Sequence, residues 1–223
     1  MKKLLVFLPL VAVLGLAGCG DKENEEEGAG EHLPYNEAQA QANMETLATD
    51  GYEISFTTTD DNGEKESSTL GTKDGFFWHY AGESKDLVYA NDTTTQDYVW
   101  EDNIFKKDGE PTVFPANLNP GKIMLATYSG VFYQANYYDS SDGFHKVKDL
   151  TFAGRSATEY RFHEGVVGIV ELTIEVIIDK ATGITLYWDV SGHAYTTGES
   201  GSASYEVTSF KTGAQVVIPA HEA

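Results

Sequence analysis

The feature that constrains this chain most is a two-residue alternation between apolar and polar side chains. Within residues 167–178, Val170, Leu172, Ile174, Val176 and Ile178 share one face of a strand, and Glu171, Thr173 and Glu175 lie on the opposite face. Because successive side chains of a β-strand point to opposite faces of a sheet, this pattern predicts a strand with one buried and one solvated face. Tyr52, Ile54 and Phe56 alternate in the same way, so we expect a mainly antiparallel β fold.

Turn signals divide the chain beyond residue 52 into further short strands. Residues 60–63 (Asp-Asp-Asn-Gly) and 179–183 (Asp-Lys-Ala-Thr-Gly) are each expected to join two antiparallel strands. Together with the alternation, they predict strands at residues 66–72, 75–80, 86–90, 97–105, 156–163, 167–178, 184–191 and 202–211. No repeat or second linker interrupts this region, so we expect a single domain over residues 33–223.

Two helices are expected beside these strands. One covers residues 36–49, with Asn36 as its N-cap, Gly51 after its end and a thin apolar face. The second begins at Asn119, with Pro120 in its first turn. Its apolar stripe at helical spacing consists of Met124, Tyr128, Val131, Phe132 and Ala135. Both helices therefore have an apolar face that a sheet can cover.

The N-terminus has the layout of a bacterial secretory signal. Lys2 and Lys3 precede an apolar run over residues 4–14, which is too short for a comfortable membrane span. The segment Leu16-Ala17-Gly18-Cys19 resembles the lipobox of bacterial lipoproteins. This resemblance implies that the signal peptide, residues 1–18, is removed and that the Cys19 thiol receives a diacylglycerol, often with a third chain such as palmitate. We therefore expect a lipid-anchored protein on the extracytoplasmic face of a cell membrane.

Cys19 is the only cysteine, so the folded part contains no disulfide. The acidic residues 20–31 include no large apolar side chain, which predicts a flexible tether over residues 19–32 rather than a binding cluster. The formal net charge of −20 opposes binding to nucleic acid and to anionic lipid headgroups. The net charge is compatible with cationic partners and divalent ions but does not select among them, and the sequence indicates no protein partner.

Three motifs in the C-terminal half resemble one known superfamily. They are residues 153–160 (Ala-Gly-Arg-Ser-Ala-Thr-Glu-Tyr), 178–186 (Ile-Asp-Lys-Ala-Thr-Gly-Ile-Thr-Leu) and 207–213 (Val-Thr-Ser-Phe-Lys-Thr-Gly). Their order is similar to that in the lipoprotein carriers and lipid-binding lipoproteins typified by LolA, LolB, LppX and LprG. The resemblance implies a curved antiparallel sheet forming an incomplete β-barrel, with helices over its open side and an apolar cavity for acyl chains. It carries over no catalytic residue.

The sequence contains no clear constellation for catalysis or metal binding, so we expect neither an enzyme nor a cofactor or metal site. Residues 198–202 (Gly-Glu-Ser-Gly-Ser) come near a nucleophile elbow but end in Ser where Gly is required, and we interpret them as a polar hairpin loop. Residues 60–63 resemble half of a calcium loop, but Thr58 and Thr69 stand at its first and last ligand positions. The six histidines are scattered singly.

Aromatic side chains give the strongest indication of a ligand. The candidate ligand-binding residues are Trp78, Tyr80, Met124, Tyr128 and Phe132, provided that strand and second helix part to admit an apolar molecule. The same residues also suit a filled core in which sheet and helix simply pack together. The expected function is a non-catalytic lipoprotein that binds a lipid or other hydrophobic ligand. The alternative is a structural or protein-interaction module of the cell envelope, and an envelope hydrolase is the least favoured interpretation.

Overall fold

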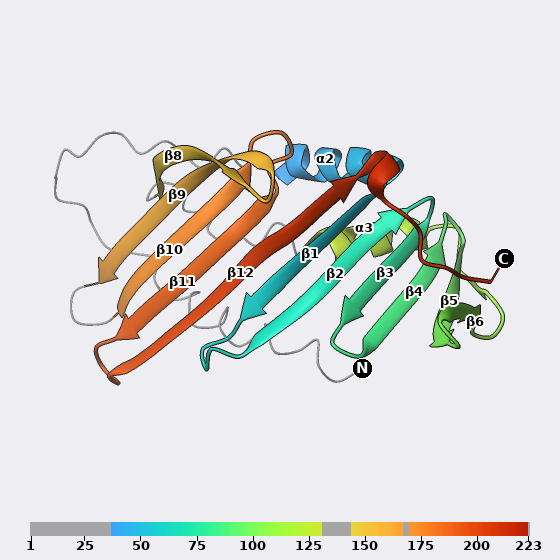
Figure 1. The fold of residues 1–223 in the computed structure, drawn as a ribbon, viewed down its shortest axis with the longest axis horizontal. Helices are drawn as coiled ribbons and strands as arrows, with labels where there is room; N and C mark the ends of the chain where they lie inside the picture. Colours follow the sequence, from blue (N-terminus) through green and yellow to red (C-terminus); the bar gives the residue numbers. More distant parts are fainter. Residues whose placement is uncertain (1–36, 131–143, 167–169, 223) are drawn as a thin grey trace.

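The computed structural model describes residues 37–130, 144–166 and 170–222. They form a 12-stranded antiparallel sheet that does not close, in the order β6-β5-β4-β3-β2-β1-β12-β11-β10-β9-β8, with β7 paired to β5 (Figure 1). The elements are α2 (Glu37–Asp50), β1 (Tyr52–Thr59), β2 (Lys65–Lys73), β3 (Phe76–Ala81), β4 (Ser84–Ala90), β5 (Thr94–Glu101), β6 (Ile104–Lys107), β7 (Thr112–Val113), α3 (Pro120–Gly130), β8 (Phe144–Phe152), β9 (Arg155–Val166), β10 (Val170–Asp179), β11 (Thr185–Ala194), β12 (Glu199–Thr212) and η3 (Gly213–Gln215). The expected mainly-β fold with an incomplete barrel is confirmed.

The sheet consists of two meanders that meet in its middle. Strands β1 to β6 form the N-terminal meander and β8 to β12 the C-terminal meander, and in each of them strands adjacent in sequence pair with one another. β1 and β12 join the two, with Tyr52 opposite Thr212 and Thr59 opposite Ser204. The first and last parts of the folded chain are thus neighbours at the centre of one sheet.

The two sides of the sheet are covered differently. The described helices lie on one side, which we call the helix side, and the other is the outer side (Figure 1). Tyr52, Ile54 and Phe56 point to the helix side and are buried there, as their alternation predicts. Because side chains alternate along every strand, the pairing registers assign the residues of the other strands to one side or the other.

Local signals in the sequence set the helix ends. Gly51, with a φ of 86°, follows the last turn of α2, where a left-handed conformation favours glycine. Asn43 of α2 donates a side-chain hydrogen bond to the carbonyl oxygen of Thr182 at 2.7 Å. At the start of α3, the side-chain oxygen of Asn119 accepts the backbone N–H of Lys122 at 2.9 Å. None of the helices in the described ranges has the length and apolar composition that crossing a membrane requires.

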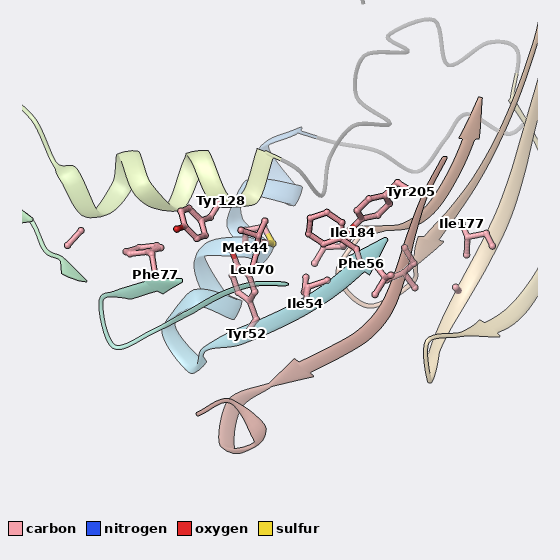
Figure 2. Packing of buried hydrophobic residues seen from close by; sticks show 14 residues of the cluster. Met44, Tyr52, Ile54, Phe56, Leu70, Phe77, Tyr128, Ile177, Ile184 and Tyr205 are labelled. Carbon is pink, nitrogen blue, oxygen red and sulfur yellow. The ribbon is translucent and has the colours of Figure 1, made fainter. Parts of the chain in front are cut away.

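Both helices pack on the N-terminal meander. α2 contacts β2, and α3 contacts β4 and β5. Figure 2 shows Tyr128 of α3 lying against Phe77 of β3, with Met44 of α2 beside them. The rings of Phe77 and Tyr128 are 5.5 Å apart at their centroids and meet edge to face. The helix side of this meander is therefore closed by ordinary core packing.

Two expectations about local structure are wrong, and one long strand, β8, was not expected. The single strand expected at residues 97–105 is a hairpin of β5 and β6, because Asp102 and Asn103 adopt left-handed φ values of 51° and 66° and make a tight turn. The loop expected at residues 198–202 ends at Gly198, and β12 begins directly after it. Strand β8 was missed because most of its side chains are exposed and three of them, Lys146, Lys148 and Asp149, are charged, which hides the alternation.

Candidate ligand-binding face

An unbroken apolar row crosses the helix side of the C-terminal meander. Its members are paired from strand to strand in the order Phe144, Phe162, Ile174, Val190 and Ala203. The alternation along β10 places Ile174 in this row, and Ile174 is completely buried. The rings of Phe144 and Phe162 lie 5.2 Å apart. With Tyr160, Val176 and Ile178, most of this row forms a cluster of buried apolar side chains.

A second row, one pleat away, is aromatic and ends at the centre of the sheet. Tyr160, Val176, Trp188 and Tyr205 are paired across β9 to β12. Trp188 stacks on Tyr205 with ring centroids 6.5 Å apart and an interplanar angle of 10°. Tyr205 in turn lies 5.0 Å from the ring of Phe56 in β1. The aromatic row thus joins the apolar surface of the C-terminal meander to the core beneath α2 and α3.

This row carries two buried polar atoms that no described residue satisfies. The Nε1 atom of Trp188 and the hydroxyl oxygen of Tyr205 are shielded from solvent and have no hydrogen-bond partner in the part of the chain that the structure describes. Burial raises the pKa of Tyr205 well above its ordinary value, so the hydroxyl keeps its proton and is a donor. Each unsatisfied buried donor costs roughly 1–3 kcal/mol. Two of them on stacked rings form a site that a hydrogen-bond acceptor would complete.

The structure does not bring the sequence-predicted ligand residues together. Met124 and Tyr128 lie on α3 and pack on the helix side, with Tyr128 against Phe77. Trp78 and Tyr80 lie on the outer side, because Thr72 on the helix side pairs with Phe77 and not with Trp78. Phe132, Val131 and Ala135 lie outside the described residues. Binding of a ligand by these residues stays an untested prediction, but Trp78 and Tyr128 face opposite sides of the sheet.

The surroundings of Trp78 are those of a filled core. The side chain is fully buried together with Leu87, Phe105 and Val216. A Cβ atom on Gly71, directly across on β2, would lie only 2.2 Å from the indole ring. Val216 belongs to the C-terminal segment, which crosses the outer side and continues to His221, 4.3 Å from the ring of Phe76. This segment closes the outer side of the N-terminal meander.

Trp188 and Tyr205 were not singled out from the sequence, although a signal for them exists. Within the strands expected at residues 184–191 and 202–211, Trp188 alternates with Val190, and Tyr205 with Val207. These positions predict that both rings are on an apolar face. What the sequence does not contain is the register that stacks one ring on the other.

The described residues do not indicate a metal-binding site. No three His, Cys, Asp or Glu side chains converge there in a way that could hold an ion. The half calcium loop is a turn in which Asp60 accepts the backbone N–H groups of Asn62 and Glu64 at 3.0 and 2.8 Å. His79 lies 3.9 Å from Asp86, and burial lowers the pKa of its imidazole despite that carboxylate.

Comparisons with known proteins give weak structural likenesses. No protein-family model matches the chain, and no curated protein matches its sequence. An uncharacterized conserved protein from Thermus thermophilus aligns with a TM-score of 0.34 at 11% identity over 84% of this chain and 99% of that one. MucB in the Pseudomonas aeruginosa MucA/MucB complex aligns with a TM-score of 0.34 at 14% identity, over 78% of this chain and 57% of that one. A LolA superfamily protein from Nitrosomonas europaea aligns with a TM-score of 0.23 at 8% identity, over 77% and 92%. At such TM-scores these likenesses carry no argument about function.

Proposed function

We propose that this protein is a non-catalytic extracytoplasmic lipoprotein that binds an amphipathic molecule, such as a lipid, on the helix side of its C-terminal meander. The observation that carries the proposal is the pair of unsatisfied polar atoms, Trp188 Nε1 and the Tyr205 hydroxyl, within an otherwise apolar surface. Such groups are uncommon in a filled core because each of them costs stability, and two of them here belong to neighbouring rings.

An amphipathic ligand matches both parts of this surface. Its hydrocarbon part would lie along the row from Phe162 to Val190, where burial of apolar area contributes roughly 25 cal/mol per Å². Its polar part, an ester or carboxylic oxygen, would accept hydrogen bonds from Trp188 and Tyr205. The hydroxyl of Tyr205 is a neutral donor because burial raises its pKa. A purely aliphatic ligand would leave both donors unsatisfied, so the site favours a molecule with a polar end.

A matched pair of tyrosine variants tests the binding proposal. The full chain with Cys19→Ala, which lacks the anchor, would be titrated with 11-(dansylamino)undecanoic acid, with energy transfer from tryptophan to the dansyl group as the signal. Tyr205→Phe should weaken binding about tenfold, the loss of one buried hydrogen bond. Tyr80→Phe, which removes a hydroxyl from the outer side, should leave the affinity unchanged. Equal affinities for all three proteins, or no saturable binding, would refute the proposal.

Anchoring through Cys19 is a separate part of the proposal with its own test. Cells expressing the full chain would be fed an alkyne analogue of palmitic acid, and the protein would be isolated from the membrane fraction and examined for the label. We expect label on the unaltered chain and none on Cys19→Ala, which should move to a soluble extracytoplasmic fraction. Label that persists after this substitution would place the lipid elsewhere.

A further inference from the structure

A polar groove lies on the outer side of the C-terminal meander, next to the hairpin that joins β11 and β12. Its volume is about 400 Å³, and every residue that lines it is polar or glycine. The lining side chains come from β10, β11 and β12, and Asp61 of the β1–β2 turn borders it. The helix side of these same strands is apolar, so the groove is chemically distinct from the lipid site proposed above.

The registers arrange the groove as two rows of side chains. Glu171, His193 and Ser200 are directly paired across three strands. Ser191 and Ser202 are paired one pleat away and line the same groove. A hydroxyl both donates and accepts hydrogen bonds, whereas a carboxylate only accepts. The groove therefore offers both hydrogen-bond donors and acceptors.

Hydrogen bonds hold the groove in place before any ligand binds. His193 Nδ1 and Ser200 Oγ are 2.7 Å apart. The hydroxyl of Tyr195 donates to Glu171 Oε2 at 2.7 Å, which fixes the tyrosine ring at the rim. The Tyr195 and His193 rings meet edge to face at 4.9 Å, and Tyr195 is 51% exposed. An exposed aromatic ring thus lies beside a polar groove, with one hydrogen bond and one ring contact to groove residues.

The arrangement of Ser200 and His193 does not suit a serine hydrolase. In a catalytic triad the serine bonds to Nε2 of the histidine and the carboxylate holds Nδ1. Here the serine occupies Nδ1, and Glu171 is held by Tyr195. The groups are placed to bind and orient polar atoms, and the nucleophile–base geometry of a triad is absent from them.

We propose that this groove is a saccharide-binding site. Sugar hydroxyls match the donors and acceptors of the groove, and the apolar face of a pyranose ring can stack on the exposed Tyr195. The carboxylates of Glu171 and Asp61, together with the net charge of −20, disfavour anionic saccharides. A lipid is excluded because the groove offers it no apolar lining. Anchored beside a membrane, the domain would thus hold a glycan chain on one side of the sheet and an amphiphile on the other.

The full chain with Cys19→Ala would be titrated with chitotetraose, cellotetraose and maltotetraose, and with tetraalanine as a peptide probe, using saturation-transfer NMR and calorimetry. We expect saturable binding of at least one tetrasaccharide and none of tetraalanine. Tyr195→Ala should weaken that binding at least tenfold, and His193→Ala should weaken it as well. Thr57→Ala, which removes an outer-side hydroxyl away from the groove, should have no effect.

The dansyl fatty-acid titration separates this inference from the proposed function. Tyr195→Ala should leave the affinity for the fatty-acid probe unchanged, and Tyr205→Phe should leave the affinity for the tetrasaccharide unchanged. Failure of all three tetrasaccharides to bind at millimolar concentration, or binding of tetraalanine instead, would overturn the saccharide site. A tetrasaccharide affinity that Tyr195→Ala does not change would overturn it too.

Discussion

The two meanders of this sheet differ in what covers their helix side and their outer side. The N-terminal meander is covered on both: α2 and α3 pack on its helix side, and the C-terminal segment with Val216 crosses its outer side. The C-terminal meander meets α2 at the β10–β11 turn, where Asn43 bonds Thr182, and its outer side is polar around the groove but buried at Ile177. One half is therefore packed on both sides, and the other has a row of buried apolar side chains on one side and a polar groove on the other.

The difference between the two meanders distinguishes two kinds of buried polar atom without a hydrogen-bond partner. Trp78 in the N-terminal meander and Trp188 in the C-terminal meander both bury an indole Nε1 atom without a partner among the described residues. Trp78 is enclosed by apolar side chains and lies flat over Gly71, so no room for a ligand is evident there. Trp188 stacks on Tyr205, which adds a second unsatisfied donor. Only the second arrangement offers a ligand two hydrogen bonds.

The largest expected effect on stability comes from a substitution that breaks the link between the C-terminal meander and α2. Asp179 is 1% exposed in its side chain and binds Arg155 through two hydrogen bonds of 2.9 and 2.8 Å. It also accepts from Thr182, whose carbonyl oxygen is bonded by Asn43 of α2. Asp179→Ala should lower the free energy of unfolding by about 4 kcal/mol, because it strands a partly buried guanidinium. Urea denaturation of both proteins measures this difference.

Glu175 on the same strand provides the matched control. It pairs with Arg161 at 3.2 Å, but the two side chains are 31% and 49% exposed. Glu175→Ala should therefore cost only about 0.5 kcal/mol. If the two substitutions destabilise the protein equally, the Asp179 network is not what holds this end of the C-terminal meander.

The next effect tests how tightly the N-terminal meander is filled. Gly71→Ala would place a Cβ atom 2.2 Å from the ring of Trp78, and Trp78 is buried too completely to move aside. We expect a loss of about 3 kcal/mol in the free energy of unfolding, at the upper end for overpacking of a core. Thermal or urea denaturation followed by tryptophan fluorescence measures it.

Gly201→Ala is the corresponding change in the C-terminal meander. A Cβ atom there would meet nothing within 4 Å. Its effect on stability should stay within about 0.5 kcal/mol, as for surface substitutions. Equal losses in the free energy of unfolding at both glycines would mean that the two meanders are packed equally tightly at these positions.

The sequence predicts the sides of this sheet well where only one of them is buried. Along β10 from Val170 to Val176, the alternation identifies the buried side correctly, because the outer positions include Glu171 and Glu175. Ile177, on the outer side, is buried as well. Around Trp78 the alternation is equally clear but both sides are apolar, with Phe77 on one and Trp78 on the other. Which of these sides meets α3 depends on the register between β2 and β3, and that register is a property of the whole sheet.

The candidate site was missed for a related physical reason. Trp188 and Tyr205 are 17 positions apart in the sequence and become neighbours only through the pairing of β11 with β12. Their missing hydrogen bonds are likewise not a property of residue type, because most buried tryptophan and tyrosine side chains find partners. The turn at Asp102 and Asn103 was missed since neither residue is the glycine that usually marks such hairpins.

A smaller effect on stability, an increase instead of a loss, tests the interpretation of Tyr205. Tyr205→Phe removes an unsatisfied hydroxyl without changing the shape of the ring, so the ligand-free protein should be unchanged or stabilised by up to about 1 kcal/mol. Urea denaturation of delipidated protein checks this. Destabilisation by more than that amount would show that the hydroxyl has a partner within the protein, and the ligand-binding interpretation would lose its main support.

The smallest effect is a pH dependence that belongs to the C-terminal meander. Asp149 of β8 is bonded by Lys180 at 2.9 Å and by the Thr158 hydroxyl at 2.9 Å. These hydrogen bonds, that of Lys180 above all, lower the pKa of Asp149 from its ordinary value of 3.8 to about 2. Because the pKa is depressed in the folded state, the stabilisation is complete about one pH unit above the ordinary pKa of 3.8 and is lost as the pH falls through about 2.

Asp149→Asn removes this contribution at every pH, so its effect should depend on pH in a defined way. The difference in thermal midpoint between the unaltered protein and Asp149→Asn should be constant above about pH 5 and should shrink steadily towards pH 2. The Asp149 side chain is about half exposed, so added salt should reduce the difference at neutral pH. A difference that grows as the pH falls would mean that the carboxylate is destabilised in the folded state, and that its lysine and threonine contacts do not form in solution.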